Sequence, residues 1–273
     1  MSWMRYMTLY SFRKLNPDWQ MTLYLSEPNG INSKTWIDSP MQDFHNFTGR
    51  DFFHRIKDLD VSVEKWELTD FPDNVDPNKI GASHKSNFFK WWKLSRVSGF
   101  YCDLDVLFVK PIDELYEQCK QSDVVISHTN YFSIGLLGSS GQNRFFHDIY
   151  KHTFQSYNPK EYQSAGVMSL HSWCKQIAED KEIPIYLCYS LIRRLYRPLR
   201  FFNMPMSWIY PWLWNQMDHV FRKSHKGVSA ECVGIHWYAG AEVSQRYNNI
   251  LDESNVAKYQ NTFSHFARDI LSK

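Results

Sequence analysis

Several features that would identify a class of protein at once are missing from this 273-residue sequence. It has no run of about 18 apolar residues, and its N-terminus lacks the apolar segment of a signal peptide, so we expect no membrane span. Lysine plus arginine number 31 and aspartate plus glutamate 29, interspersed along the chain. This near balance leaves no basic tract for nucleic acid, and we expect no nucleic-acid partner.

Cysteine is also sparse and poorly placed for cross-linking. The cysteines are odd in number, widely spaced and without a C-x-x-C pair, which argues against both a disulfide framework and a zinc site. A reducing compartment is the simpler interpretation, and we predict a cytoplasmic protein.

Aromatic residues are what the sequence has in excess. They make up 17% of the chain, with eleven tryptophans, and rings beyond the needs of the core often line sugar or base sites. Trp208, Tyr210, Trp212 and Trp214 alternate in one short segment and could stack on a sugar. Packing of a half-buried strand explains the same alternation.

Hydrophobic periodicity predicts alternating helices and strands. Helical spacing covers residues 4–15, 83–97 (ended by Gly99), 113–120 and a final segment from about 253. Strand-like runs cover 20–25, 61–66, 100–109, 123–127 and 232–236, and the chain beyond residue 150 is expected to be more irregular. This alternation favours an α/β fold with a mostly parallel central sheet and flanking helices.

Two aspartates interrupt the strand-like run 100–109. In a strand, Asp103 and Asp105 would project on the same face, where two carboxylates repel each other unless a cation shares them. Open α/β sheets bind ligands at strand ends, and a hard divalent ion takes carboxylates together with substrate phosphates. The pair therefore predicts a metal site, although a lone D-x-D also occurs in turns and on solvent-facing surfaces.

The residues before this pair strengthen the prediction. The segment from Ser86 to Ile112, SNFFKWWKLSRVSGFYCDLDVLFVKPI, resembles the DXD-containing sugar transferase family, which includes capsular polysaccharide glycosyltransferases, the yeast initiating mannosyltransferase and glucosylating toxin catalytic domains. The resemblance implies a single GT-A-like domain over 1–273. Residues 1–127 would form the nucleotide-sugar-binding half, and 128–273 the acceptor-side half with a C-terminal metal-site segment.

Residue roles on the donor side follow from this resemblance. A family Asp falls on Asn87 and a family Arg on Lys90, three residues apart on one helical face, so these side chains would contact the donor sugar and a phosphate. Lysine cannot reproduce the bidentate grip of arginine. Asp103 would also meet the donor ribose, and Asn130, which opens a segment similar to the family's, would lie near the reacting carbon as a catalytic contact.

A second resemblance concerns the metal. Gly234-Ile235-His236-Trp237 is similar to the family's late His-Trp motif, in which His236 would complete the metal shell with Asp103 and Asp105. An imidazole beside carboxylates favours Mn²⁺ over Mg²⁺. The family's usual first strand, of the type Ile-His-x-x-Trp-x-Gly, is not matched, so we assign no base-contacting residues.

The expected function is transfer of a sugar from a nucleoside diphosphate sugar to a hydroxyl of a glycan, lipid-linked or protein acceptor, as in polysaccharide biosynthesis. The cofactor would be Mn²⁺ or Mg²⁺, and the family retains anomeric configuration. A haloacid dehalogenase-like phosphatase is one alternative, but its motif lies near the chain start and has Thr or Val where this chain has Leu107. A non-catalytic sugar-binding protein of the same fold is another, since Asn87 and Lys90 depart from the pattern.

Overall fold

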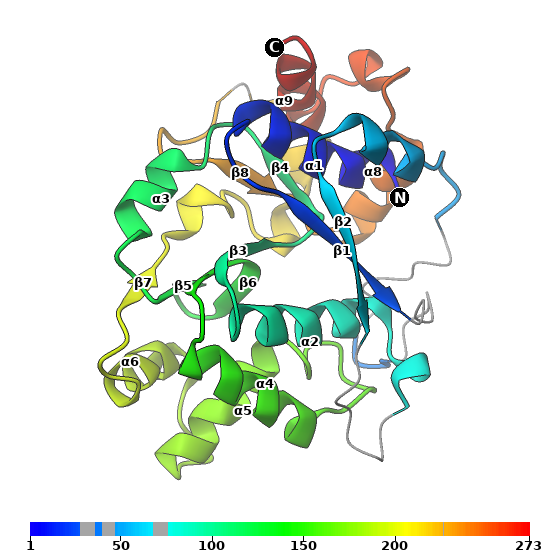
Figure 1. The fold of residues 1–273 in the computed structure, drawn as a ribbon. Helices are drawn as coiled ribbons and strands as arrows, with labels where there is room; N and C mark the ends of the chain where they lie inside the picture. The colour runs from blue at the N-terminus through cyan, green and yellow to red at the C-terminus, as the bar shows by residue number, and fades with distance from the viewer. Residues whose placement is uncertain (28–35, 40–46, 68–75, 226) are drawn as a thin grey trace.

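The computed structural model describes residues 1–27, 36–39, 47–67, 76–225 and 227–273 (Figure 1). The helices in these ranges are α1 (Trp3–Leu15), α2 (Ala82–Leu94), α3 (Asp113–Cys119), α4 (Arg144–Ser156), α5 (Val167–Ala178), α6 (Ile185–Leu195), α7 (Asp218–Phe221), α8 (Glu242–Ile250) and α9 (Thr262–Leu271). The strands are β1 (Thr22–Glu27), β2 (Ser62–Glu67), β3 (Ser98–Cys102), β4 (Val106–Phe108), β5 (Val124–His128), β6 (Phe132–Ser140), β7 (Phe201–Asn203) and β8 (Gly234–His236).

The strands form three small sheets rather than one. A four-stranded sheet has the order β3-β6-β5-β7, and β1-β2 and β4-β8 form separate pairs. Only β1-β2 and β5-β7 are parallel, so the expectation of a mostly parallel central sheet is wrong for the described residues, although the fold is α/β. The reason is the tight turn at residues 129–131, which joins β5 directly to β6 and so makes the two strands antiparallel.

The expected strand 100–109 is also two strands. The chain leaves β3, turns at Asp103–Asp105 and enters β4 in a different sheet. The N–H of Asp103 donates to the carbonyl of Gly135 at 2.7 Å, and the N–H of Trp237 donates to the carbonyl of Asp105 at 2.8 Å. The two aspartates therefore lie in a turn anchored to β6 and β8, and strand alternation does not explain their arrangement.

Helix α1 lies against the pair β4-β8. Ser2 begins the helix, because its hydroxyl accepts from the N–H of Arg5, and Arg13 and Lys14 in the last turn complement the helix dipole. The apolar face, including Trp3 and Met7, is buried in a core shared with β4, β8 and α9. Figure 1 shows α1, α8 and α9 together at one end of the molecule.

Helices α2, α4 and α5 gather at the opposite end, on the other side of the four-stranded sheet (Figure 1). Helix α2 ends at Leu94, earlier than expected, and Gly99 does not terminate it but lies in β3 with a φ of +133°, a conformation that glycine adopts readily. Among the described residues, no helix is both long and apolar enough to cross a bilayer.

The chain after residue 150 is more helical than expected. Helices α5 and α6 lie there, and the prolines fall between helices rather than inside them, Pro159 after α4 and Pro184 as the N-cap of α6. The final helix begins at Thr262 rather than near residue 253, and α8 precedes it. The expectation of irregular structure is therefore wrong for residues 167–195, which are mostly helical, but holds for residues 196–217, where β7 and two short 3-10 turns are the regular elements.

Candidate functional site

A cavity of about 1500 Å³ opens where α1, β1, α2 and the Asp103–Asp105 turn meet. Its wall also contains the β5-β6 turn and the segment that follows β8. The side chains predicted from the sequence all line this cavity, namely Asn87, Lys90, Asp103, Asp105, Asn130 and His236. Asn87 and His236, which are 149 positions apart in the chain, thus line the same cavity.

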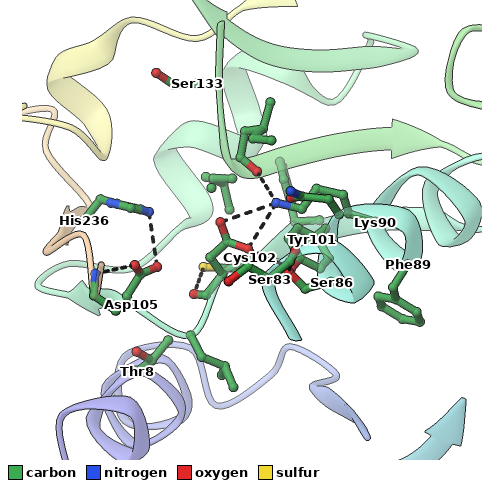
Figure 2. A pocket seen from close by; sticks show the side chains of 18 of the residues that line it. Thr8, Ser83, Ser86, Phe89, Lys90, Tyr101, Cys102, Asp105, Ser133 and His236 are labelled. Carbon is green, nitrogen blue, oxygen red and sulfur yellow. Dashed lines mark hydrogen bonds and ion pairs between the residues drawn. The ribbon is translucent and has the colours of Figure 1, made fainter. Parts of the chain in front are cut away.

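Asp103 is held by two neighbours. The ammonium of Lys90 lies 3.2 Å and 3.4 Å from its two carboxylate oxygens, and the hydroxyl of Tyr101 donates to Oδ1 at 2.7 Å. Lys90 also donates to the carbonyl of Ile134 at 3.2 Å, and only 1% of its side chain is exposed. The dashed lines that start at Lys90 in Figure 2 mark its contacts. The lysine therefore fixes the position of Asp103.

Asp105 is more deeply buried than Asp103. The N–H of Ala239 donates to Oδ2 at 2.8 Å, and Nε2 of His236 lies 3.2 Å from Oδ1. Burial alone raises the pKa of this carboxyl, but His236 and the Ala239 N–H outweigh it and hold the pKa at about 2. Asp105 is consequently a carboxylate at every physiological pH.

His236 reaches Asp105 because residue 135 is a glycine. A Cβ at Gly135 would lie 2.7 Å from both Cδ2 and Nε2 of the imidazole. The ring of Tyr238 contacts His236 edge to face at 4.1 Å between centroids, and the N–H of Tyr238 donates to Nδ1 at 3.3 Å. With Nδ1 accepting from Tyr238, Nε2 is the ring nitrogen that faces Asp105.

The three side chains suit a divalent ion. One ligand atom from each of Asp103, Asp105 and His236 lies within 4.8 Å of the others. Oδ1 of Asp105 is buried, and Nε2 of His236 at 3.2 Å is the contact that the described residues give it. A buried carboxylate needs a compensating partner, and a cation bound between the carboxylate and the imidazole could take that place. The set of two carboxylates and one imidazole offers oxygen and nitrogen ligands that divalent first-row metal ions accept.

Asn87 and Asn130, predicted to contact the donor sugar and the reacting carbon, also line the cavity. Asn87 on α2 packs beside Gly166, where an added Cβ would be 3.0 Å from Nδ2, and Asn130 is exposed in the β5-β6 turn. In the aromatic segment, Trp208 is buried in the core, whereas Trp214 is 59% exposed at the cavity. Core packing thus accounts for Trp208 and leaves Trp214 accessible to a ligand.

Sequence reasoning missed three contributors to this site. Arg5 on α1 lines the cavity, Gly135 gives His236 its space, and the backbone N–H of Ala239 binds Asp105. Ala239 lies two residues beyond the Gly234–Trp237 segment, so extending that segment would have included it. Arg5 and Gly135 carry no local pattern, because their proximity to the aspartates comes from tertiary structure.

Comparison with known proteins adds little to the site. No protein-family model matches the chain, and no curated protein sequence matches it. A solved structure described as "PaToxG Glycosyltransferase" is similar, at 12% sequence identity and a TM-score of 0.44, over 71% of this chain and 72% of that one. A likeness at this level carries no argument about activity, so function has to be argued from the site.

Proposed function

We propose that the protein is a metal-dependent glycosyltransferase that takes a sugar from a nucleoside diphosphate sugar. The observation that carries this proposal is the juxtaposition of Asp103, Asp105 and His236, within 4.8 Å, on the wall of a large cavity. The resemblance of the preceding helix and strand to the DXD-containing sugar transferases supports it. Such a cavity is large enough for a nucleotide sugar, whereas a purely structural metal site needs no cavity.

The proposed roles divide the residues into two groups. Asp105 and His236 hold the metal, and Asp103 completes the site while Lys90 and Tyr101 fix its carboxylate. The chemistry that a divalent ion supplies when bound is neutralisation of the charge that develops on a departing diphosphate. Mn²⁺ suits the site better than Mg²⁺ because of the imidazole.

The second group acts on the sugar and the acceptor. Asn87 orients the donor sugar, and Asn130 lies near the reacting carbon, where a hydroxyl of a glycan, lipid-linked or protein acceptor attacks. Tyr131 and Trp214, which are 67% and 59% exposed at the cavity, offer ring faces for an acceptor. The proposed stereochemical outcome is retention, as in the family, and the anomeric configuration of the product reports it.

The phosphatase alternative requires Asp103 to attack phosphorus as a nucleophile. In this structure both oxygens of Asp103 are already engaged by Lys90, and Oδ1 also by Tyr101, which lowers their nucleophilicity. Incubation with a generic phosphomonoester and Mg²⁺ separates the two functions. Rapid phosphate release that Asp103→Asn abolishes would refute the transferase and establish the phosphatase.

Calorimetry with a panel of nucleotide sugars tests the proposal without knowledge of the acceptor. We expect binding of at least one donor only when Mn²⁺ is present, and loss of that binding in Asp105→Ala. Binding that needs no metal, or that Asp105→Ala leaves unchanged, would contradict the proposed site. Metal-dependent binding without any donor hydrolysis would favour the non-catalytic sugar-binding protein.

A further inference from the structure

Helix α6, at the edge of the molecule in Figure 1, presents three large apolar side chains to solvent. Its inward side chains Cys188 and Ile192 are buried in the core that it shares with α4 and α5. Tyr186, Leu187 and Leu195 are 58%, 46% and 47% exposed, and no other described helix has more than one large hydrophobic residue in this state. A single exposed leucine is ordinary, but a group of such side chains on one helix indicates a surface that contacts a partner.

Three arginines share the outward face of α6 with these side chains. Arg193 and Arg194 lie in the last turn, Arg197 follows the helix, and all three are exposed. None of their guanidinium groups forms a hydrogen bond or an ion pair with another described residue. Arg193 comes two turns after Tyr186, and Arg194 two turns after Leu187, so charged and apolar side chains lie along the same face. Cations at a helix C-terminus complement the helix dipole, but that role does not require exposed apolar side chains beside them.

The acidic groups that precede α6 lie at its opposite end. Residues 179–182 contain three acidic side chains and one lysine, just before the helix begins. From Ile185 to Arg193 the helix rises about 12 Å, which exceeds the screening length of about 8 Å in physiological salt. These acidic groups therefore do not neutralise the arginine end.

The acidic groups beside the arginine end already have basic partners. Asp123 lies 3.5 Å from Arg200, and Asp148 lies 3.5 Å from Arg144 and accepts from the hydroxyl of Tyr196 at 2.9 Å. Each of these carboxylates thus has a cation of its own. The charges of Arg193, Arg194 and Arg197 remain as an excess at this end of α6.

The other end of α6 adjoins the candidate site. Nε2 of His128, the last residue of β5, lies 3.2 Å from the carbonyl of Ile185, and its ring stacks on Tyr189 at 5.6 Å between centroids. Residues 129–131 follow at once and line the cavity, where Tyr131 is 67% exposed. The outward face of α6 therefore begins beside a wall of the cavity.

We propose that this face of α6 docks on an anionic phospholipid surface. The arginines contact the charged headgroups, while Tyr186 and Leu187 enter the boundary between headgroups and acyl chains. A nucleic acid would also attract the arginines, but its phosphate backbone offers Leu187 no apolar contact. The inference goes beyond the proposed function and stands without it, because docking requires neither a donor nor an acceptor.

The test is co-sedimentation of the full chain with lipid vesicles in about 0.15 M salt. One set of vesicles is pure phosphatidylcholine, and the other contains about 30% phosphatidylserine, which supplies the negative surface charge. We expect binding to the second set alone. In the triple variant Arg193→Gln, Arg194→Gln, Arg197→Gln the partition coefficient should fall by about 100-fold, because each basic residue near a charged membrane contributes about five-fold.

A second triple variant, Lys57→Gln, Arg222→Gln, Lys258→Gln, is the matched control. It removes the same number of positive charges at exposed positions outside α6, and we expect its binding to stay within about two-fold of wild type. A thermal unfolding curve for each variant shows whether it is folded, and Arg193→Glu alone serves if the first triple variant is not.

The apolar contribution has its own pair of variants. Tyr186→Ser with Leu187→Ser should weaken binding to the anionic vesicles by about 10-fold, because two side chains no longer leave water. Ile250→Ser with Leu271→Ser is the control, since these residues are 40% and 38% exposed on α8 and α9. We expect this control to bind as the wild type does.

Three results would overturn the docking surface. The first is no binding to either set of vesicles, or equal binding to both. The second is binding that the arginine variant leaves within about two-fold of wild type. The third is loss in the arginine variant but not in Tyr186→Ser with Leu187→Ser, because that pattern indicates a site for a polyanion rather than for a lipid surface. All three leave the proposed transferase intact.

Discussion

Replacing Gly135 by alanine tests how His236 reaches the metal without altering any ligand group. The new Cβ would lie 2.7 Å from Cδ2 and Nε2 of His236, whereas carbon atoms in contact prefer about 3.5 Å, so the ring must retreat by roughly 0.8 Å. His236 is 6% exposed and contacts Tyr210 and Tyr238, so it can move only by disturbing its neighbours. A metal site does not tolerate such a displacement of one ligand.

The expected result is a fall of about 10- to 100-fold in Mn²⁺ affinity, the loss typical when a residue that orients a metal ligand is changed. Electron paramagnetic resonance titration of Mn²⁺ measures it in the presence of a nucleoside diphosphate. Gly138→Ala is the control, because its Cβ would meet Val125 at 2.9 Å in the core, away from the metal ligands. Gly138→Ala should lower the free energy of unfolding but leave the Mn²⁺ affinity unchanged. Wild-type Mn²⁺ affinity in Gly135→Ala would refute the assignment of His236.

Three further predictions concern the carboxylates and their neighbours. Because the pKa of Asp105 in the folded protein is about 2, against an ordinary value of 3.8, its carboxylate contributes roughly 2 kcal/mol above about pH 4, which is lost as pH falls toward about 2. In Asp105→Asn, the melting temperature measured in thermal unfolding scans should fall less between about pH 4 and about pH 2 than it does in the wild type. An equal fall in both proteins would contradict the lowered pKa of Asp105. Lys90→Met removes the ammonium that Asp103 and the Ile134 carbonyl share and should lower the free energy of unfolding by about 1–3 kcal/mol in urea titrations. Tyr101→Phe removes one hydrogen bond to Asp103 and should cost about 1 kcal/mol, with a smaller effect on Mn²⁺ affinity than Asp105→Asn.

Local elements were predictable because their causes are local. Residues 4–15 have helical periodicity and end at Asn16-Pro17, and α1 covers Trp3–Leu15. The strands expected at 20–25 and 61–66 are β1 and β2, each displaced by one or two residues. Strand pairing was not predictable in this way, because the partner of β3 is β6 and that of β4 is β8, choices made by tertiary packing.

In the candidate site, too, features with a local cause were predictable from the sequence and features set by tertiary packing were not. Asp103, Asp105 and His236 could be singled out from short motifs, and one ligand atom of each lies within 4.8 Å of the others, while their metal-binding role stays a prediction. The reason given for the two aspartates was wrong in part, since they lie in a turn and not along a strand. Gly135 could not be predicted as the residue that admits His236, because a glycine acquires that role only from the side chain packed against it.

The most direct measurement is a screen of nucleotide sugars for slow hydrolysis in the presence of Mn²⁺, since hydrolysis requires no acceptor. We predict release of nucleoside diphosphate from at least one donor, stopped by a chelator, restored by Mn²⁺ more than by Mg²⁺, and absent in Asp105→Asn. Hydrolysis that persists in the chelator or in Asp105→Asn would contradict the central claim that Asp103, Asp105 and His236 form the catalytic metal site.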